Sequence, residues 1–392
     1  MDKRGLRLVL FYPFPRRGGI ERAFFNLSAE LTKRLPDTKG LTFDGDPYFL
    51  AHVRPPARVE SARLPLRWLE RAAIVPRDAR NGVRILAALV RNLRQARPDV
   101  VLAFQFGVLA VAANRLTGSR AAVVIRESNT PSVAVAGGRG LVWRVKLGLK
   151  RMAYRRAAYV IAVSEGVRQD VLRRLGLPAA RVVTIYNISD REEIRRQASE
   201  PVDHPWFADG AGVPVIVSAG RLSHEKDHAT LIRAFAEVVK RHEARLLILG
   251  EGSRRGRLEA LVRELGLEDR VWMPGFIENP FPYVARASVF AFSSVYEGVG
   301  NALIEAQMCG VPIVSTDCPS GPREILADGA AGTLVPVGDA PAMAEAIARY
   351  LREPELARGH VARATALLSR FSAQVVGEQY QSVVERAAVE WR

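Results

Sequence analysis

Short apolar segments alternate with segments of helical period along almost the whole chain, and this alternation is the strongest constraint on its fold. In the first half, apolar residues recur at helical spacing from 20 to 35, directly after the first apolar segment. Strands that are separated by helices pair in parallel, so this order predicts a doubly wound α/β sheet. The strands predicted in this half are 6–12, 100–104, 121–126, 159–164 and 182–186, and Ser164 and Gly176 are the expected caps of a helix over 165–175.

The second half repeats the alternation, and 392 residues suffice for two domains that each bury a core. A Pro- and Asp-containing segment without periodicity, 199–214, is typical of a linker. We therefore predict two Rossmann-like parallel-sheet domains, 1–198 and 199–372, and a final helix within 373–392. The strands predicted in the second half are 215–218, 246–249, 271–273, 289–292, 313–316 and 332–335.

A glycine-rich turn lies where the strand over 289–292 ends and a helix begins near 302. It reads Ser-Ser-Val-Tyr-Glu-Gly-Val-Gly-Asn-Ala-Leu-Ile-Glu-Ala from Ser293 to Ala306. Gly298 and Gly300 let the backbone approach a ligand closely. The first amides of the helix, at the positive end of its dipole, favour an anion. The sequence therefore predicts an anion site, with Glu297 before the turn and Glu305 one turn inside the helix.

A second strand-to-helix turn lies upstream and reads Ser-Ala-Gly-Arg-Leu-Ser-His-Glu-Lys-Asp-His from Ser218 to His228. Taken together, the two turns resemble those of the retaining glycosyltransferases of the group 1, family 4 type. The resemblance extends from Gly18-Gly19 to the end of the chain. It implies the GT-B architecture, in which two Rossmann-like sheets face a cleft and the final helix crosses back to pack on the first domain.

The resemblance also implies roles for the charged residues of these turns. Breaking the bond between a sugar and a nucleoside diphosphate places negative charge on the leaving oxygens, which fixed cations and amides stabilise. Arg221 and Lys226 match the cations that hold the diphosphate. Glu297 matches the acid beside the sugar and phosphate, and Glu305 the acid that accepts hydrogen bonds from the ribose. We assign Arg221, Lys226 and Glu297 to catalysis.

Further donor contacts are expected from backbone groups and small residues that line the same turns. The turn itself would contribute Val299, Gly300, Asn301 and Ala302, where Val299 replaces a frequent aromatic residue and leaves sugar specificity open. The remaining donor contacts expected are Gly18 and Gly19 in the first domain, and Gly250, Phe276 and Ile277 in the second.

The first domain departs from the family at one functional position. Many relatives carry a histidine near the sugar, at the end of the strand predicted over 121–126, but this chain reads Ile-Arg-Glu-Ser-Asn-Thr-Pro from Ile125. We assign Arg126 and Glu127 to that role and take Glu127 as the catalytic candidate. The histidines His224 and His228, beside Lys226, are expected to be solvated or to neighbour the phosphates.

Charge is divided unevenly along the chain. Residues 1–200 contain 37 Lys and Arg against 17 Asp and Glu, whereas residues 201–392 contain 20 against 24. A basic half suits an anionic partner: a nucleic acid, an anionic membrane surface or an anionic lipid substrate. Two basic segments with interspersed apolar residues, 63–77 and 138–156, have a composition that suits lipid headgroups, although each is equally an ordinary helix with its apolar side in the core.

The resemblance implies a retaining glycosyltransferase, and with the basic first half we expect it to move a hexose or N-acetylhexosamine from a UDP-linked donor to a lipid-linked or oligosaccharide acceptor. The start of the chain has no secretory signal, which favours a cytoplasmic protein, peripheral on the inner face of the cytoplasmic membrane. No cofactor and no metal is expected beyond the nucleotide sugar. Asp44 and Asp46 imitate a metal-binding pair but lie in a proline-flanked loop.

Three alternatives stay open. A GDP-mannose-dependent mannosyltransferase and a nucleotide-sugar epimerase would share the fold, although the paired Arg-x4-Lys and Glu-x7-Glu patterns favour transfer over epimerisation. A basic nucleic-acid-binding protein belongs to another class. We expect no nucleic-acid partner, because the arginines are scattered among apolar helical positions without a recognisable reading helix.

Overall fold

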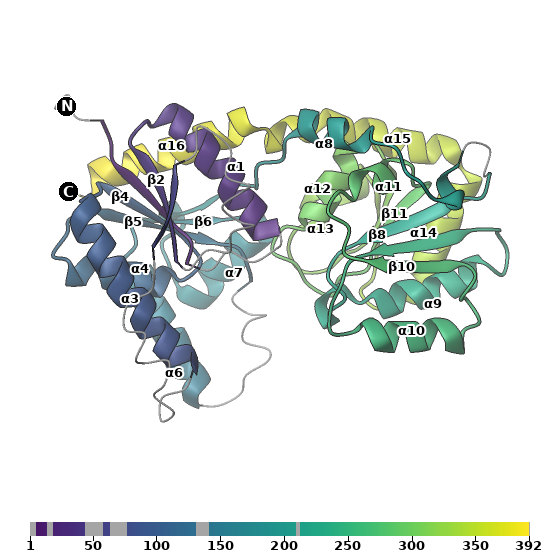
Figure 1. The fold of residues 1–392 in the computed structure, drawn as a ribbon, viewed down its shortest axis with the longest axis horizontal. Helices are drawn as coiled ribbons and strands as arrows, with labels where there is room; N and C mark the ends of the chain where they lie inside the picture. The colour runs from purple at the N-terminus through teal and green to yellow at the C-terminus, as the bar shows by residue number, and fades with distance from the viewer. Residues whose placement is uncertain are drawn as a thin grey trace. The chain divides into compact units, whose positions relative to one another are not determined.

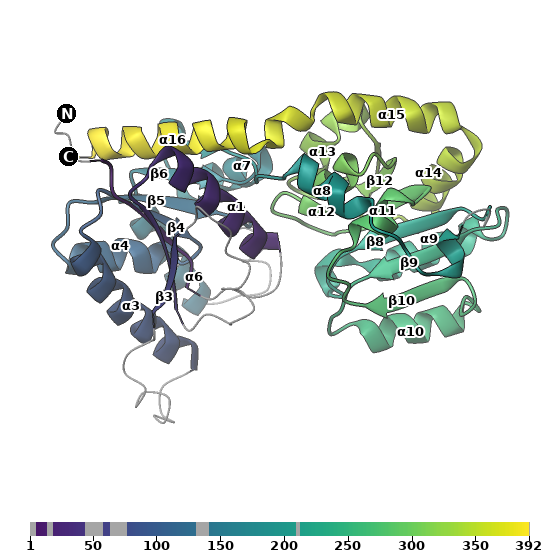
Figure 2. The ribbon, with the colours of Figure 1, turned by 45° about the horizontal axis from the view of Figure 1, so that its top comes forward.

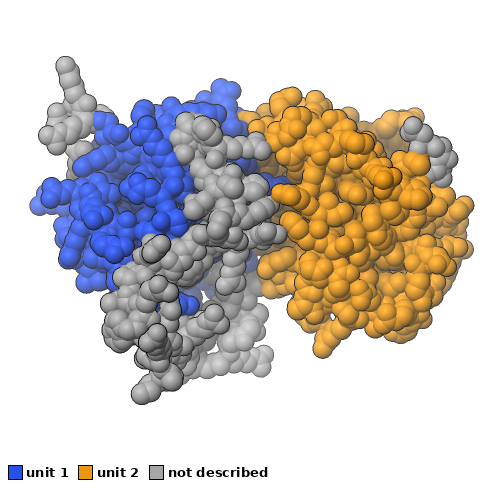
Figure 3. Space-filling model, in the orientation of Figure 1, with its two compact units in different colours: residues 1–188, 373–392 blue, residues 189–372 orange. Residues whose placement is uncertain are grey.

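The computed structural model of the chain describes residues 5–13, 19–43, 58–62, 77–130, 141–208 and 212–391. Gly18, Asp44, Asp46 and most of the basic segment 63–77 lie outside the described residues. The chain divides into two compact units, residues 1–188 with 373–392 and residues 189–372, which Figure 3 distinguishes by colour. Each unit contains one parallel sheet with helical crossovers, so the predicted α/β fold class is confirmed.

Unit 1 contains a seven-stranded sheet in the order β3-β2-β1-β4-β5-β6-β7. All its paired strands are parallel, and the order reverses between the neighbours β1 and β4. Its longer elements are β1 (Leu8–Phe11), α1 (Gly19–Arg34), β2 (Thr38–Phe43), β3 (Val59–Ala62), α3 (Arg77–Ala96), β4 (Val100–Phe104), α4 (Gly107–Leu116), β5 (Ala122–Glu127), α6 (Leu141–Tyr154), β6 (Tyr159–Ala162), α7 (Glu165–Leu175), β7 (Val182–Thr184) and α16 (Ala373–Glu390).

Two strands of unit 1, β2 and β3, lie where the sequence predicted none. β2 reads Thr-Lys-Gly-Leu-Thr-Phe, and its polar residues hide the apolar pattern of a buried strand. The Thr38 hydroxyl donates to the Leu35 carbonyl at 2.6 Å, which explains how a buried threonine is accommodated there.

The predicted caps of α7 are confirmed, because the Ser164 side chain accepts from the Val167 amide and Gly176 ends the helix.

Helices cover both faces of the unit 1 sheet (Figures 1 and 2). α1 and α16 pack against each other on one face, and α3, α4 and α6 lie on the opposite face. α16 contributes Val376, Tyr380 and Val384 to the same core as Leu8 and Leu10 of β1. The last helix of the chain is thus part of the first unit, because its apolar side completes that core.

Unit 2 contains a six-stranded parallel sheet in the order β10-β9-β8-β11-β12-β13, and this order reverses between β8 and β11. Ligands of such sheets bind at the carboxyl ends of the strands where the order reverses. Its elements are β8 (Val215–Ala219), α9 (His228–Val238), β9 (Arg245–Leu249), α10 (Arg255–Glu264), β10 (Val271–Gly275), α11 (Phe281–Ala285), β11 (Val289–Phe292), α12 (Asn301–Met308), β12 (Ile313–Thr316), α13 (Pro322–Ile325), β13 (Thr333–Val335), α14 (Ala340–Arg352) and α15 (Pro354–Ala366). None of the helices in the described ranges combines the length and the apolar composition that a membrane span needs.

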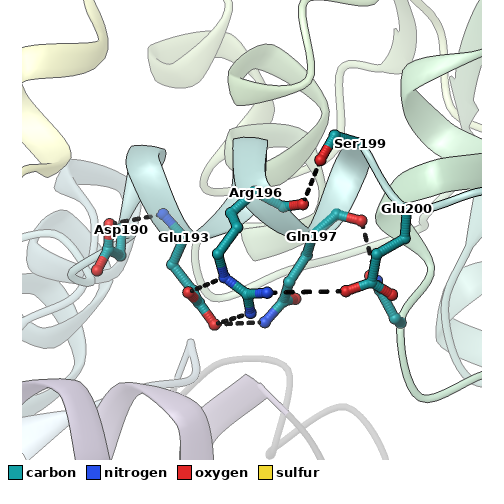
Figure 4. Close-up of polar contacts among 7 residues, drawn as sticks. Asp190, Glu193, Arg196, Gln197, Ser199 and Glu200 are labelled. Carbon is teal, nitrogen blue, oxygen red and sulfur yellow. Dashed lines mark hydrogen bonds and ion pairs between the residues drawn. The ribbon is translucent and has the colours of Figure 1, made fainter.

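The helix α8 (Arg191–Ala198) belongs to unit 2, so the boundary between the units lies at 188/189 and not at the expected 198/199. Figure 4 shows its polar network, in which Asp190 caps the helix and Arg196 donates twice to Glu193. The helix end is held by Asn279, whose amide donates to the Gln197 carbonyl at 3.0 Å. α8 also packs against α11 and α12, which explains why it stays with this unit.

Candidate functional site

The reversal in the unit 2 sheet brings two predicted site residues into direct contact. Lys226 lies in the loop after β8, and Glu297 lies in the loop after β11. These strands pair in parallel, with Val289 opposite Ile216, so both loops leave the same edge of the sheet. The Lys226 ammonium donates to Glu297 Oε1 at 2.5 Å, although the two residues are 71 positions apart in the sequence.

The Glu297 carboxylate is held by a second donor. The Ser294 hydroxyl donates to the same Oε1 atom at 2.7 Å. The side chains of Lys226 and Glu297 are only 18% and 12% exposed, which strengthens their charge-assisted hydrogen bond relative to one at the surface. The Lys226 ammonium also lies 5.1 Å from the centre of the Phe292 ring, a cation–π contact. The cation expected to hold a phosphate is therefore fixed in position.

Hydrogen bonds to backbone carbonyls tie the two loops together. The Ser293 hydroxyl donates to the Lys226 carbonyl at 2.8 Å, and the Val295 amide donates to the Glu225 carbonyl at 2.8 Å. The Glu225 carboxylate lies 3.1 Å from Arg221, whose side chain is 75% exposed. Burial alone would raise the pKa of Glu225. Hydrogen bonds from its own amide and from Ser223, with the charges of Arg221 and Lys226, outweigh burial and lower the pKa.

The turn over 297–302 has the geometry that its glycines indicate. Gly300 precedes α12 with a φ of +82°, in the left-handed region that favours glycine. The Ser320 hydroxyl donates to the Gly298 carbonyl at 2.8 Å and holds the turn from the loop after β12. Gly300 provides no side-chain cap, so α12 begins at Asn301 and Ala302 with the positive end of its dipole beside the loop that follows β11. Val299 is buried and Glu305 is partly buried one turn further along.

The ends of β8, β9 and β10 meet closely, and glycine makes this possible. Gly250 has a φ of +146°, and a Cβ there would lie 1.9 Å from the Gly220 carbonyl oxygen. Its amide donates to the Gly275 carbonyl at 2.8 Å. The next two residues after β10 are Phe276, which is 57% exposed, and Ile277, which is partly buried. An exposed aromatic ring thus follows β10, the strand that is separated from β8 by β9 alone.

Sequence reasoning missed or misjudged some residues of this site. Ser293 and Ser294 belong to the glycine-rich turn, but their residue types alone indicate no role, and the pair of hydroxyls before the glycines is the single signal for them. The expectation that His228 is solvated is wrong. His228 is 3% exposed because it begins α9 and packs inward, whereas His224 is exposed. Burial, and next the charge of Lys226, lowers the pKa of His228 to about 4.

Glu127 is buried at the end of β5 in unit 1, and α6 holds it. The Tyr154 hydroxyl donates to Glu127 Oε2 at 2.6 Å, and the Lys150 ammonium lies 2.6 Å from the same oxygen. Burial, and next the charge of Glu127, raises the pKa of Tyr154. Glu127 is therefore half of a charge-assisted cluster whose other half lies entirely on α6.

Of the two glycines that were expected to contact the donor in this unit, Gly19 is the first residue of α1.

Arg126 is 2% exposed, and its role in this structure is to join distant segments. Its Nε donates to the Tyr380 hydroxyl of α16 at 3.1 Å, and Nη1 donates to Ser128 at 2.5 Å. Nη2 donates to the side chain of Asn187, directly before the unit boundary. The guanidinium also lies over the Phe104 ring. These contacts occupy Arg126 in the core of unit 1.

Two family models match the chain. The model described as Glycosyltransferase Family 4 matches residues 17–193, and the model described as Glycosyl transferases group 1 matches residues 213–353.

The curated proteins that are similar in sequence include two sugar transferases. The Campylobacter jejuni N-acetylgalactosamine-N,N'-diacetylbacillosaminyl-diphospho-undecaprenol 4-alpha-N-acetylgalactosaminyltransferase is 34% identical over 248 residues, which are 63% of this chain and 65% of that protein. The Streptomyces fradiae 2-deoxystreptamine N-acetyl-D-glucosaminyltransferase is 29% identical over 399 residues, and the match covers 96% of this chain and 93% of that protein. The chain thus spans slightly less than two thirds of the first relative.

Solved structures share the fold over both units. HepE from Anabaena, in complex with UDP, superimposes with a TM-score of 0.79 at 20% identity, covering 97% of this chain and 100% of that one. A Rickettsia africae glycosyltransferase superimposes with a TM-score of 0.76 at 15% identity, covering 98% of both chains. At this identity the likeness shows the fold, which is GT-B.

Proposed function

Because the chain belongs to the group 1 and family 4 glycosyltransferases, we propose that it transfers a hexose or N-acetylhexosamine from a UDP-linked donor to a glycan acceptor. The observation that carries the proposal is the contact between Lys226 and Glu297 at the reversal of the unit 2 sheet. It places a partly buried cation and a partly buried carboxylate in the loops beside the amino end of α12, where an anionic ligand is favoured.

The donor diphosphate is the group that this arrangement suits. A lysine ammonium has three N–H donors, and the contact with Glu297 uses one of them, so the others serve phosphate oxygens. Arg221 is exposed at the rim, and its planar fork suits a second phosphate. As the sugar–phosphate bond breaks, these cations and the α12 dipole stabilise the charge on the leaving group. Glu305, inside α12, accepts hydrogen bonds from the ribose.

Retention of configuration is part of the proposal and rests on the family. The acceptor attacks from the face that the diphosphate leaves, and the leaving phosphate takes the acceptor proton. Glu297, held by Lys226 and Ser294, lies beside the sugar in this scheme. The reaction needs no metal ion, because fixed cations and helix amides neutralise the diphosphate.

The acceptor in this proposal is lipid-linked, and the enzyme works at the inner face of the cytoplasmic membrane. Support comes from the name of the Campylobacter relative, whose acceptor is linked to diphospho-undecaprenol. The basic first half of the chain adds a physical reason, since it attracts anionic headgroups and pyrophosphates.

A melting-temperature panel of nucleotides and nucleotide sugars tests the donor. A ligand at 100 times its Kd stabilises the folded state by about 2.7 kcal/mol, a readily measured shift. UDP and one UDP-sugar should raise the Tm, and Lys226→Ala should reduce that shift. Arg263→Ala, an exposed arginine of α10, is the matched control and should leave the shift unchanged. A shift with GDP and GDP-mannose alone would make GDP-mannose the donor in place of a UDP-sugar. No shift with any nucleotide would refute the proposal.

A further inference from the structure

The helix α6 turns three large apolar side chains outward. Val145, Leu149 and Met152 are 52%, 47% and 49% exposed. They are spaced four and three residues apart, so they form one stripe along the helix. The side that faces the protein is occupied by Ala153 and Tyr154, which are both buried. The stripe is therefore not the core-facing side of an ordinary surface helix.

Basic side chains accompany the stripe. A hollow of about 440 Å³ lies on the C-terminal half of α6 and is lined by Gly148, Arg151, Met152, Arg155 and Arg156. The sequence contains no Asp or Glu between Glu127 and Glu165, and it contains seven Lys and Arg there. Guanidinium groups bind phosphate oxygens through paired hydrogen bonds, and the adjacent apolar side chains suit the start of an acyl chain.

A second apolar hollow lies on the same helical layer of unit 1. It has a volume of about 540 Å³ and is lined by Val83, Leu86, Ala87, Val90, Arg91, Arg94 and Gln95 of α3 with Leu116 of α4. α4 packs against both α3 and α6, and Figures 1 and 2 show the three helices on one face of the sheet. Apolar side chains and arginines therefore recur on neighbouring helices of one layer.

We propose that the helical layer formed by α3, α4 and α6 docks on an anionic phospholipid bilayer. Lipid phosphates lie among Arg151 of α6 and the two arginines directly after this helix, Arg155 and Arg156. The apolar stripe of α6 enters the boundary between headgroups and acyl chains. Charge complementarity favours this occupant, and the apolar stripe favours a bilayer over a nucleic acid, which offers no apolar layer to receive it. The inference rests on the proposed function and deepens it by naming the surface that meets the membrane.

Docking through α6 also bears on the acceptor. The same helix holds Glu127 through Lys150 and Tyr154 on its inner side. A bilayer on the outer side of α6 therefore lies one helix away from the carboxylate at the end of β5. A lipid-linked acceptor in that bilayer reaches the protein at this helix.

Sedimentation with vesicles tests the docking surface in the full chain. Vesicles of phosphatidylcholine with phosphatidylglycerol should bind the protein, pure phosphatidylcholine should not, and 0.5 M salt should release it. The double variant Leu149→Ser/Met152→Ser should lower the partition coefficient at least tenfold. Val389→Ser, which changes another exposed apolar residue of unit 1, is the matched control and should bind like the parent.

The charges are tested in the same way. Arg155→Glu/Arg156→Glu should abolish vesicle binding, whereas the exposed pair Arg257→Glu/Arg263→Glu on α10 should preserve it. Three outcomes would overturn the inference. The variants could bind vesicles as well as the parent does, or the parent could bind neutral vesicles equally well. The variants could also lose binding to a nucleic acid while they keep binding to vesicles.

The UDP-induced Tm shift is recorded for every variant, because it separates this inference from the proposed function. A parent protein that responds to UDP but ignores anionic vesicles refutes the docking surface alone. A protein that binds such vesicles through α6 without any nucleotide response refutes the proposed enzyme and keeps the surface.

Discussion

Mild acid should destabilise the protein through one buried histidine. His228 is 3% exposed at the start of α9, and its Nδ1 has no hydrogen-bond partner among the described residues. Burial and the nearby Lys226 charge lower its pKa to about 4 from the ordinary value of 6.5. The folded state therefore holds this imidazole neutral at a pH where the unfolded chain would protonate it.

The size of the effect follows from proton linkage. Above about pH 7 His228 is neutral in both states and contributes no pH dependence. As the pH falls through 6.5, this imidazole binds a proton in the unfolded chain. In the folded protein it stays neutral until about pH 4, so stability is lost on acidification. The loss from this residue is roughly 2 kcal/mol at pH 5 and about 3 kcal/mol once the pH is below 4.

Urea unfolding at pH 8, 7, 6 and 5 measures this loss, followed by tryptophan fluorescence and circular dichroism together. His228→Gln should have a shallower decline in unfolding free energy between pH 7 and 5 than the parent, by roughly 2 kcal/mol. The exposed His224 provides the matched control, and His224→Gln should keep the parental decline. Parallel declines for the parent and His228→Gln would refute the claim that this histidine is buried and neutral.

Further outcomes follow from the site itself. Lys226→Ala should lower kcat in a steady-state transfer assay by roughly 10²-fold, since it removes a donor to the leaving phosphate; full turnover would exclude this lysine from the mechanism. Glu305→Gln should mainly raise the donor KM, whereas Glu297→Gln should mainly lower kcat, and the reverse pattern would exchange their roles. Transfer should survive excess EDTA, so a loss that manganese restores would contradict the metal-free scheme. Gly250→Ala should lower the unfolding free energy by at least about 2 kcal/mol, because its Cβ would lie 1.9 Å from a carbonyl oxygen. Gly256→Ala, with no atom within 4 Å of the new Cβ, should be neutral or slightly stabilising in the same melt.

The strands, helices and turns that local sequence specifies were predicted closely. β4 and β11 have the predicted bounds, and the α7 caps Ser164 and Gly176 have their expected roles. Such features depend on residues within a few positions of each other, where apolar period, capping hydroxyls and glycine act directly. The glycine-rich turn before α12 belongs to the same class, since its left-handed residue, Gly300, is readable from residue type alone.

The chain order of strands did not reveal which polar side chains would be buried, or with which partners. His224 lies before α9 and His228 begins this helix, only four residues later. His224 is nevertheless exposed, whereas His228 is buried. Arg126 and Glu127 are adjacent on β5, but Arg126 joins α16 and Asn187 while Glu127 joins α6. Alternate residues of a strand face opposite sides of the sheet, and the helices on those sides come from distant sequence.

Two α/β units and a turn suited to an anion are thus readable from the sequence, because periodicity and glycine act locally. Tertiary packing, by contrast, brings Lys226 to Glu297 across 71 positions and turns Val145, Leu149 and Met152 outward. Both outcomes depend on which elements become neighbours. Parallel pairing of β8 with β11 decides the first, and the packing of Ala153 and Tyr154 decides which side of α6 is covered.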